Sequence, residues 1–173
     1  QQRIKNNFIS RDALFSCPDQ IKIQFLAQYA KEKNKRLVII PRVKGSFLTK
    51  KELRKTIDQE KEYHIKLLGY EPEFIFLPGL SPNYKAIDSA EVIVSLDSTL
   101  GYESISRGNK TAIFSFRGTI NGINSWDYGW PADYPDEGPF WTNKPDSDIF
   151  IRILDYLFEV SDEQWKKDVE ATN

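Results

Sequence analysis

Four short apolar segments, each separated from the next by a stretch with helical spacing, constrain the fold of this chain more than any other feature. They are rich in β-branched and aromatic residues and read RLVIIP (36–41), EFIFLP (73–78), EVIVSL (91–96) and KTAIFSF (110–116). Within each segment apolar residues stand at successive positions, so both faces of each strand are expected to be covered. Strands that alternate with helices in this way predict an α/β fold, a Rossmann-like doubly wound parallel sheet.

The segments between these strands carry signals for helix starts and stops. Pro18 and Asp19 are the predicted start of the first helix, and Gly69 and Gly108 are the predicted stops of two others. Ser161 is the predicted cap of the last helix. The predicted helices cover residues 18–34, 49–69, 81–90, 98–108 and two segments within 145–171.

The composition indicates one domain with no general attraction to polyanions. A length of 173 residues predicts a single Rossmann-like domain over 1–173. Lys and Arg number 24 against 25 Asp and Glu, so no nucleic-acid partner is expected. The single cysteine, Cys17, excludes an internal disulfide framework and fits a reducing compartment. The single histidine, His64, is expected to be packed or solvent-facing rather than a general base, and no metal site is predicted.

The ends of the chain and its hydropathy bear on localisation. No apolar run approaches the roughly 18 residues that span a bilayer, so no transmembrane segment is predicted. The start QQRIKNNFISRD lacks the apolar centre of a signal peptide. The predicted localisation is cytoplasmic, with access to the inner face of the membrane through partners. Because methionine is absent even from position 1, we expect the domain to be excised from a longer chain.

The segment SLDSTLGYE (95–103) holds the principal candidate ligand-binding residues. It joins a predicted strand to a predicted helix, and in an open parallel sheet ligands bind beyond the carboxyl ends of the strands. Ser98 and Thr99 stand at the helix start, where backbone N–H groups and the helix dipole favour a phosphate. Gly101 allows close backbone approach. Glu103, one turn further on, is a suitable acceptor for the two hydroxyls of a ribose, so the segment predicts half of a nucleotide site.

Two further readings stay open for this edge of the sheet. Asp97 and Ser98 are also ordinary helix-capping residues, with Glu103 then a solvated surface side chain. Arg42 and Lys44 follow another predicted strand at the same edge, where they would neutralise a diphosphate or a carboxylate, Arg42 by a bidentate contact.

The long irregular stretch from about 117 to 145 concentrates aromatic residues among glycines, prolines and acids. A loop of this length is usually functional or disordered. Its aromatic side chains suit either stacking on bases or sugars or the anchoring of the loop to the domain. The acids Asp133, Asp136 and Glu137 receive no catalytic role. The aromatic residues are Trp126, Tyr128, Trp130, Tyr134, Phe140 and Trp141.

The stretch AEVIVSLDSTLGYESISRGNKTAIFSFRG (90–118) resembles the C-terminal, donor-binding half of GT-B type glycosyltransferases of bacterial surface polysaccharide biosynthesis. It is less closely similar to nucleotide-sugar 2-epimerases built on the same scaffold. RLVIIPRVKG (36–45) and FIFLPGLSPNYKAIDSA (74–90) extend the resemblance over nearly the whole chain. In the first of these, PR stands where many relatives carry HP.

The resemblance implies a domain that binds a nucleotide-sugar, whose sugar is transferred to a polysaccharide or lipid-linked acceptor. Ser98 and Thr99 would meet the donor phosphates, Glu103 the ribose, and the turn 108–110 would return the chain to the sheet. No cofactor and no metal are implied. The general base would come from an N-terminal domain missing here, so the isolated domain would bind without turnover. A 2-epimerase-like domain and a non-catalytic nucleotide-binding scaffold module are the alternatives.

Overall fold

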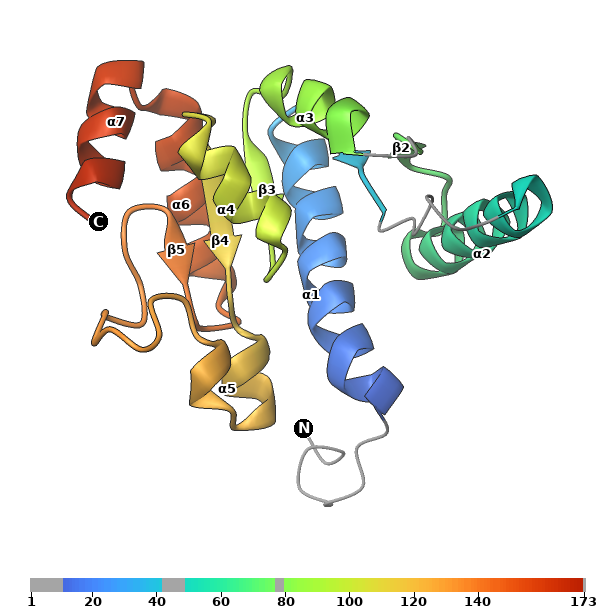
Figure 1. Cartoon of the computed structure of the whole chain (residues 1–173), viewed down its shortest axis with the longest axis horizontal. Coiled ribbons are helices and arrows are strands. Elements are labelled where there is room, and N and C mark those ends of the chain that lie inside the picture. The colour runs from blue at the N-terminus through green and yellow to red at the C-terminus, as the bar shows by residue number, and fades with distance from the viewer. Residues whose placement is uncertain (1–10, 42–48, 77–79, 173) are drawn as a thin grey trace. The chain divides into compact units, whose positions relative to one another are not determined.

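The computed structural model describes residues 11–41, 49–76 and 80–172 (Figure 1). The chain divides into two compact units, one formed by Ile23–Ser89 and the other by Gln1–Lys22 with Ala90–Asn173. Helix α1 (Arg11–Glu32) belongs in part to each. Both units combine helices with parallel strands, which agrees with the predicted α/β class.

The unit formed by residues 23–89 contains a two-stranded parallel sheet. Strands β1 (Val38–Ile39) and β2 (Glu73–Phe74) pair with Val38 opposite Glu73 and Ile39 opposite Phe74. Helix α2 (Lys50–Leu68) connects them, and α3 (Leu80–Asp88) follows β2. Helix α2 ends at Gly69, whose φ of 79° is the left-handed conformation that glycine adopts without strain, so the predicted stop is confirmed.

The other unit contains a three-stranded parallel sheet in the order β3-β4-β5. Its strands are β3 (Ile93–Ser95), β4 (Thr111–Phe114) and β5 (Trp141–Thr142). Helix α4 (Thr99–Ser106) connects β3 with β4, and α5 (Arg117–Asn121) and a short 3₁₀ helix, η1 (Asn124–Trp126), follow β4. Helices α6 (Ser147–Glu159) and α7 (Asp162–Glu170) complete the chain, and Ser161 caps α7 as predicted.

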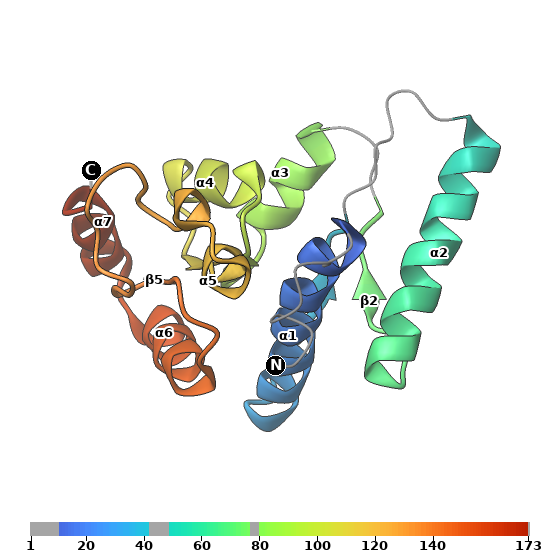
Figure 2. The same ribbon diagram turned by 90° about the horizontal axis from the view of Figure 1, so that it is seen from below.

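Alternation along β4 places helices on both faces of this sheet. A Cβ built on Gly101 of α4 would lie 3.2 Å from Ile113 Cδ1. The next residue, Phe114, stacks on Phe150 of α6 with ring centroids 4.2 Å apart. Successive side chains of a strand point to opposite faces, so α4 and α6 cover opposite faces of the sheet (Figures 1 and 2). All four residues of β4 are buried, as its continuous apolar sequence requires.

Three expectations from sequence differ from the structure. Helix α1 begins at Arg11, and Pro18 lies inside it with a fully buried side chain. Proline removes one backbone hydrogen bond but its φ is helical, so burial of its ring can offset that loss. The described strands form two sheets, where one continuous sheet was predicted. The stretch 117–145 is less irregular than expected, because it contains α5, η1 and β5.

None of the helices in the described part of the chain has both the length and the apolar character that a bilayer span requires.

Candidate functional site

The start of α4 lies directly beyond the carboxyl end of β3. Ser98 is its N-cap, and its side chain accepts a hydrogen bond from the Leu100 N–H. Ser98 and Thr99 are both exposed, so packed side chains do not fill this corner. A Cβ on Gly101 would lie only 2.4 Å from Ser95 Cβ. Glycine at this position therefore permits the close approach of α4 to β3.

The backbone N–H groups of this helix start are only partly engaged. Ser98 N–H donates to Ser95 Oγ and Leu100 N–H to Ser98 Oγ, both at 3.3 Å. These separations are longer than the usual range of about 2.7–3.2 Å, so a ligand can displace both bonds at little cost. Gly101 N–H donates to the Ser98 carbonyl at 2.9 Å. Within the described residues, Thr99 N–H has no acceptor, and it is the amide most available to an anion.

Glu103 lies on the side of α4 that is turned away from the sheet. Gly101 and Ser104 form the buried side of the helix, and Glu103, two residues after Gly101, is about 200° around the axis from it. Thr99 and Glu103 are four residues apart and so share one helix face. Within the described part of the chain, the Glu103 carboxylate has no hydrogen bond or ion pair. It is free to accept hydroxyls from a ligand held near Thr99.

A charged cluster beside this helix start was missed by sequence reasoning. Asp97 follows β3 and Arg117 follows β4, and Arg117 Nε lies 2.8 Å from Asp97 Oδ2. Arg117 also contacts Asp19 of α1 at 3.3 Å, and Lys22 contacts the same carboxylate at 3.3 Å. The Ser115 hydroxyl is 3.5 Å from Asp97 Oδ1. The signal that could have found the pair is an acid directly after one strand and a base directly after the neighbouring strand.

The cluster is electrically balanced, because two acids face two bases. The side chains of Asp97 and Arg117 are 28% and 13% exposed. Burial raises the pKa of Asp97 and nearby Asp19 adds to the rise, while Arg117, Lys22 and Ser115 act in the opposite direction. Asp97 therefore pairs with Arg117 and does not cap α4, whereas Ser98 does.

A pocket of about 400 Å³ adjoins α4 and is built from η1, the loop after it and Tyr102 of α4. The rings of Tyr102 and Tyr128 stack with centroids 6.0 Å apart and an interplanar angle of 4°. Burial, and then the charge of Asp97, raise the pKa of Tyr102. Trp130 is 61% exposed.

The aromatic stretch thus divides into two groups. Phe140 and Trp141 are buried and pack edge to face, so they anchor the loop, as one of the two readings expected. Trp126 and Trp130 remain exposed at the pocket. Anchoring is confirmed for the first group, and ligand stacking stays a prediction for the second.

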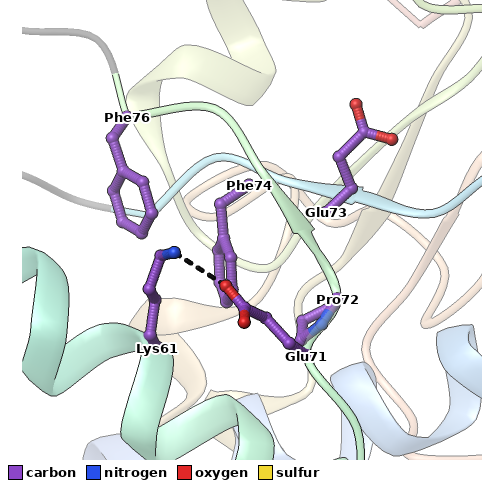
Figure 3. A pocket seen from close by; sticks show the side chains of 6 residues that line it. All are labelled: Lys61, Glu71, Pro72, Glu73, Phe74 and Phe76. Atoms are coloured by element: carbon purple, nitrogen blue, oxygen red, sulfur yellow. Dashed lines mark hydrogen bonds and ion pairs between the residues drawn. The ribbon is translucent and has the colours of Figure 1, made fainter.

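A second pocket, of about 450 Å³, lies in the unit formed by residues 23–89 (Figure 3). Lys61 and Glu71 pair across it at 2.7 Å, and Glu73 points away from that pair (Figure 3). Glu73 binds Arg36. These charged side chains are largely exposed and already paired with one another. The pocket is therefore a weaker candidate than the edge of β3 and β4.

Residues 2–172 match the family model described as "putative O-antigen biosynthesis protein". The chain belongs to this family. No curated protein and no solved structure matches it. Membership supports a part in surface polysaccharide biosynthesis, and this agrees with the biosynthetic process that the sequence resemblance implies. The narrower GT-B assignment stays a prediction.

The remaining predicted site residues fall into two groups. Arg42 and Lys44 lie outside the described residues. His64 is buried, with Nδ1 2.8 Å from the Glu60 carbonyl oxygen and its ring edge-on to Phe74, so the packed reading is confirmed. Over residues 11–41, 49–76 and 80–172, no group of His, Cys, Asp and Glu side chains is arranged to hold a metal ion.

Proposed function

We propose that this chain is the nucleotide-sugar-binding domain of a glycosyltransferase of O-antigen biosynthesis. The observation that carries the proposal is the start of α4: exposed Ser98 and Thr99 hydroxyls, no acidic residue in the first turn, and a position at the carboxyl end of β3. Parallel α/β sheets bind nucleotides at this edge. Family membership supplies the biosynthetic context.

The donor phosphates lie against the first turn of α4. The Thr99 N–H and the hydroxyls of Ser98 and Thr99 donate to the phosphate oxygens, assisted by the positive end of the helix dipole. Arg42 and Lys44 are the proposed basic partners of the diphosphate. Charge that develops on the leaving phosphate is stabilised by the donors at the start of α4, and this part of the chemistry needs no metal ion.

The ribose of the donor binds to Glu103. Its carboxylate shares a helix face with Thr99 and has no partner within the described residues. A carboxylate can accept both hydroxyls of a ribose at once. Gly101 supports this arrangement indirectly, because it lets α4 lie directly on β3 and so fixes the distance between the sheet edge and Glu103.

A thermal-shift screen of the chain against UDP, CMP, CDP, GDP and dTDP sugars tests the proposal. A ligand that binds only the folded form stabilises it by about 2.7 kcal/mol at one hundred times its Kd. We expect one nucleotide class to raise the unfolding temperature and Glu103→Ala to reduce that shift. Glu163→Ala, which removes an exposed acid from the first turn of α7, is the matched control and should leave the shift intact.

Two outcomes would redirect the proposal. If no nucleotide sugar stabilises the chain, the start of α4 is an ordinary capped helix start. If a nucleotide sugar binds but the full-length protein neither transfers nor hydrolyses it, the chain is a non-catalytic nucleotide-binding scaffold module.

A further inference from the structure

The aromatic pocket beside α4 takes no part in the nucleotide site proposed above, and its lining indicates a different ligand. Its volume of about 400 Å³ is near the lower end of the range of about 300–1,000 Å³ for small-molecule sites. A site of this size suits a single ring better than a whole nucleotide. Ligand binding in this pocket does not require nucleotide binding at α4.

Aromatic rings make up most of the wall. Five of its nine lining residues are aromatic, and Trp130 and Tyr102 are 61% and 43% exposed. The faces of aromatic rings carry partial negative charge and attract the weakly positive C–H groups on the flat face of a pyranose. The aromatic lining residues are Tyr102, Trp126, Tyr128, Trp130 and Tyr134.

Two rings of the wall, Tyr128 and Tyr102, are held in place before any ligand arrives. The Tyr128 ring lies 5.2 Å from the buried Trp141 ring. The backbone N–H of Tyr128 donates to Asn143 Oδ1 at 2.8 Å. Tyr102 stacks on the Tyr128 ring with an interplanar angle of 4°. Rings fixed in this way lose little conformational freedom when a ligand binds, which favours recognition of a small rigid molecule.

The pocket has few polar side chains in its described lining, and the one charged side chain among them is negative. Asp127 is the only charged residue in the described lining. Ser125 adds a neutral hydroxyl. Asp127 Oδ1 is buried beside Gly118 and has no hydrogen-bond partner within the described residues, so a ligand in the pocket does not reach this oxygen. Asp127 as a whole is only half-buried and lines the pocket, so the exposed remainder of its carboxylate is the acceptor for ligand hydroxyls. No Lys, Arg or His belongs to the described lining, which argues against a phosphate or a carboxylate as ligand.

A polyhydroxylated ring without negative charge satisfies all of these features. The geometry points to a carbohydrate subsite in which a neutral or amino-substituted pyranose stacks on Trp130 and Tyr102 and donates its hydroxyls to Asp127. In a protein of O-antigen biosynthesis, a pyranose of the glycan under assembly has this chemistry. A nucleobase would also stack here, but it would bring phosphates to a pocket without a basic side chain.

The four tryptophans allow a test with an internal reference. In the full chain labelled with 5-fluorotryptophan, ¹⁹F NMR reports on Trp126 and Trp130 at the pocket and on the buried Trp141 and Trp165. The probes are methyl glycosides of glucose, galactose, mannose, rhamnose and N-acetylglucosamine, methyl glucuronide as the anionic counterpart, and the nucleosides uridine and adenosine. We expect at least one neutral methyl glycoside to shift the Trp130 resonance, while Trp165 stays unchanged and the glucuronide binds more weakly.

Substitutions complete the test. Trp130→Ala should weaken glycoside binding about tenfold, equivalent to about 1.4 kcal/mol, with Trp126 as the remaining reporter. Tyr70→Ala, which removes an aromatic ring that is 49% exposed and lies outside this pocket, should have no effect.

Should Trp130→Ala fail to fold, Tyr102→Ala provides the same measurement. Absence of any glycoside-induced shift at the pocket, equal binding by Trp130→Ala, or preference for nucleosides or for the glucuronide would overturn the inference. None of these results bears on nucleotide binding at α4, which the thermal screen tests separately.

Discussion

The starts of helices α2 and α4 differ in how each satisfies its own backbone, and the difference separates a structural helix start from a candidate binding site. At α2, Thr49 and Glu52 form a capping box, in which the Glu52 carboxylate accepts from the Thr49 N–H at 2.8 Å. The acid thus neutralises the positive end of its own helix. At α4, hydroxyls replace the acid: Ser98 caps, Thr99 follows, and no carboxylate lies in the first turn.

The carboxylate nearest to the start of α4 in sequence is occupied elsewhere. Asp97 pairs with Arg117 at 2.8 Å instead of folding over the helix start. The dipole of α4 is therefore left for an external anion, whereas that of α2 is already compensated. Two features distinguish the start of α4, which lies at the binding edge of a parallel sheet. It is capped by a hydroxyl, and the neighbouring acid, Asp97, is paired with Arg117.

The largest expected effect concerns how α4 is seated. Gly101→Val should destabilise the chain by about 3 kcal/mol, because a Cβ would lie 2.4 Å from Ser95 Cβ. Gly69→Ala at the end of α2 meets no neighbouring atom within 4 Å and should cost only about 1 kcal/mol from its left-handed φ. Urea unfolding measures both. Equal costs would mean that α4 is not held against β3 as closely as described.

The next effect separates the two glutamates. Glu103→Gln should weaken binding of the donor nucleotide about tenfold, or about 1.4 kcal/mol, because a charged acceptor for the ribose hydroxyls is lost. Glu52→Gln should leave donor affinity unchanged, since Glu52 is committed to Thr49. Isothermal titration calorimetry of both variants decides the point. A loss of affinity in Glu52→Gln as large as that in Glu103→Gln would remove the distinction between the two helix starts.

A smaller effect is expected from the caps themselves. Thr49→Ala and Ser98→Ala each remove an N-cap oxygen and should each lower the free energy of unfolding by about 1 kcal/mol. Only Ser98→Ala should also weaken donor binding, by about 0.5–1.5 kcal/mol. Chemical denaturation and calorimetry on the same samples give both quantities. If donor binding is indifferent to Ser98, its hydroxyl serves the helix alone.

The smallest expected effect is on the pH dependence of stability, to which Glu52 and Asp97 should contribute slopes of opposite sign. Hydrogen bonds from Thr49 lower the pKa of Glu52, so its contribution is present above the ordinary Glu pKa and is lost as pH falls through the lowered value. Burial raises the pKa of Asp97, so folded Asp97 retains a proton between its ordinary and raised values, and stability falls as pH rises across that window.

Urea unfolding of Glu52→Gln and Asp97→Asn at a series of acidic pH values measures these slopes. The stability difference between the unmodified chain and Glu52→Gln should increase with pH, and that for Asp97→Asn should decrease. An increase for Asp97→Asn would show that Arg117 outweighs burial at this carboxyl.

Short-range signals explain the parts of the fold that sequence alone predicts. The caps Ser98 and Ser161 and the stop at Gly69 each depend on contacts within one helical turn, so their residue types suffice. The strands at 93–95 and 111–114 follow from continuous apolar runs. Strand β5 is two residues long and has no comparable apolar run, so the sequence predicts a loop at its position.

Long-range contacts account for what sequence alone does not predict at the site. Arg117 meets Asp19 across 98 residues of chain and Asp97 across 20 residues, and neither contact has a local pattern. The aromatic pocket likewise joins Tyr102 to residues beyond 124. Such pairings depend on the order of strands in the sheet, which the spacing of apolar segments leaves open.

Backbone amide NMR tests the central claim most directly. The ¹⁵N-labelled chain is titrated with the nucleotide sugar that stabilises it most in the thermal screen. We predict the largest shifts at the Thr99 amide and its neighbours through Glu103, with the amides of residues 50–52 at the start of α2 unmoved. Shifts that concentrate at α2, or none between residues 98 and 103 under conditions where the nucleotide binds, would contradict the assignment of α4 as the phosphate site.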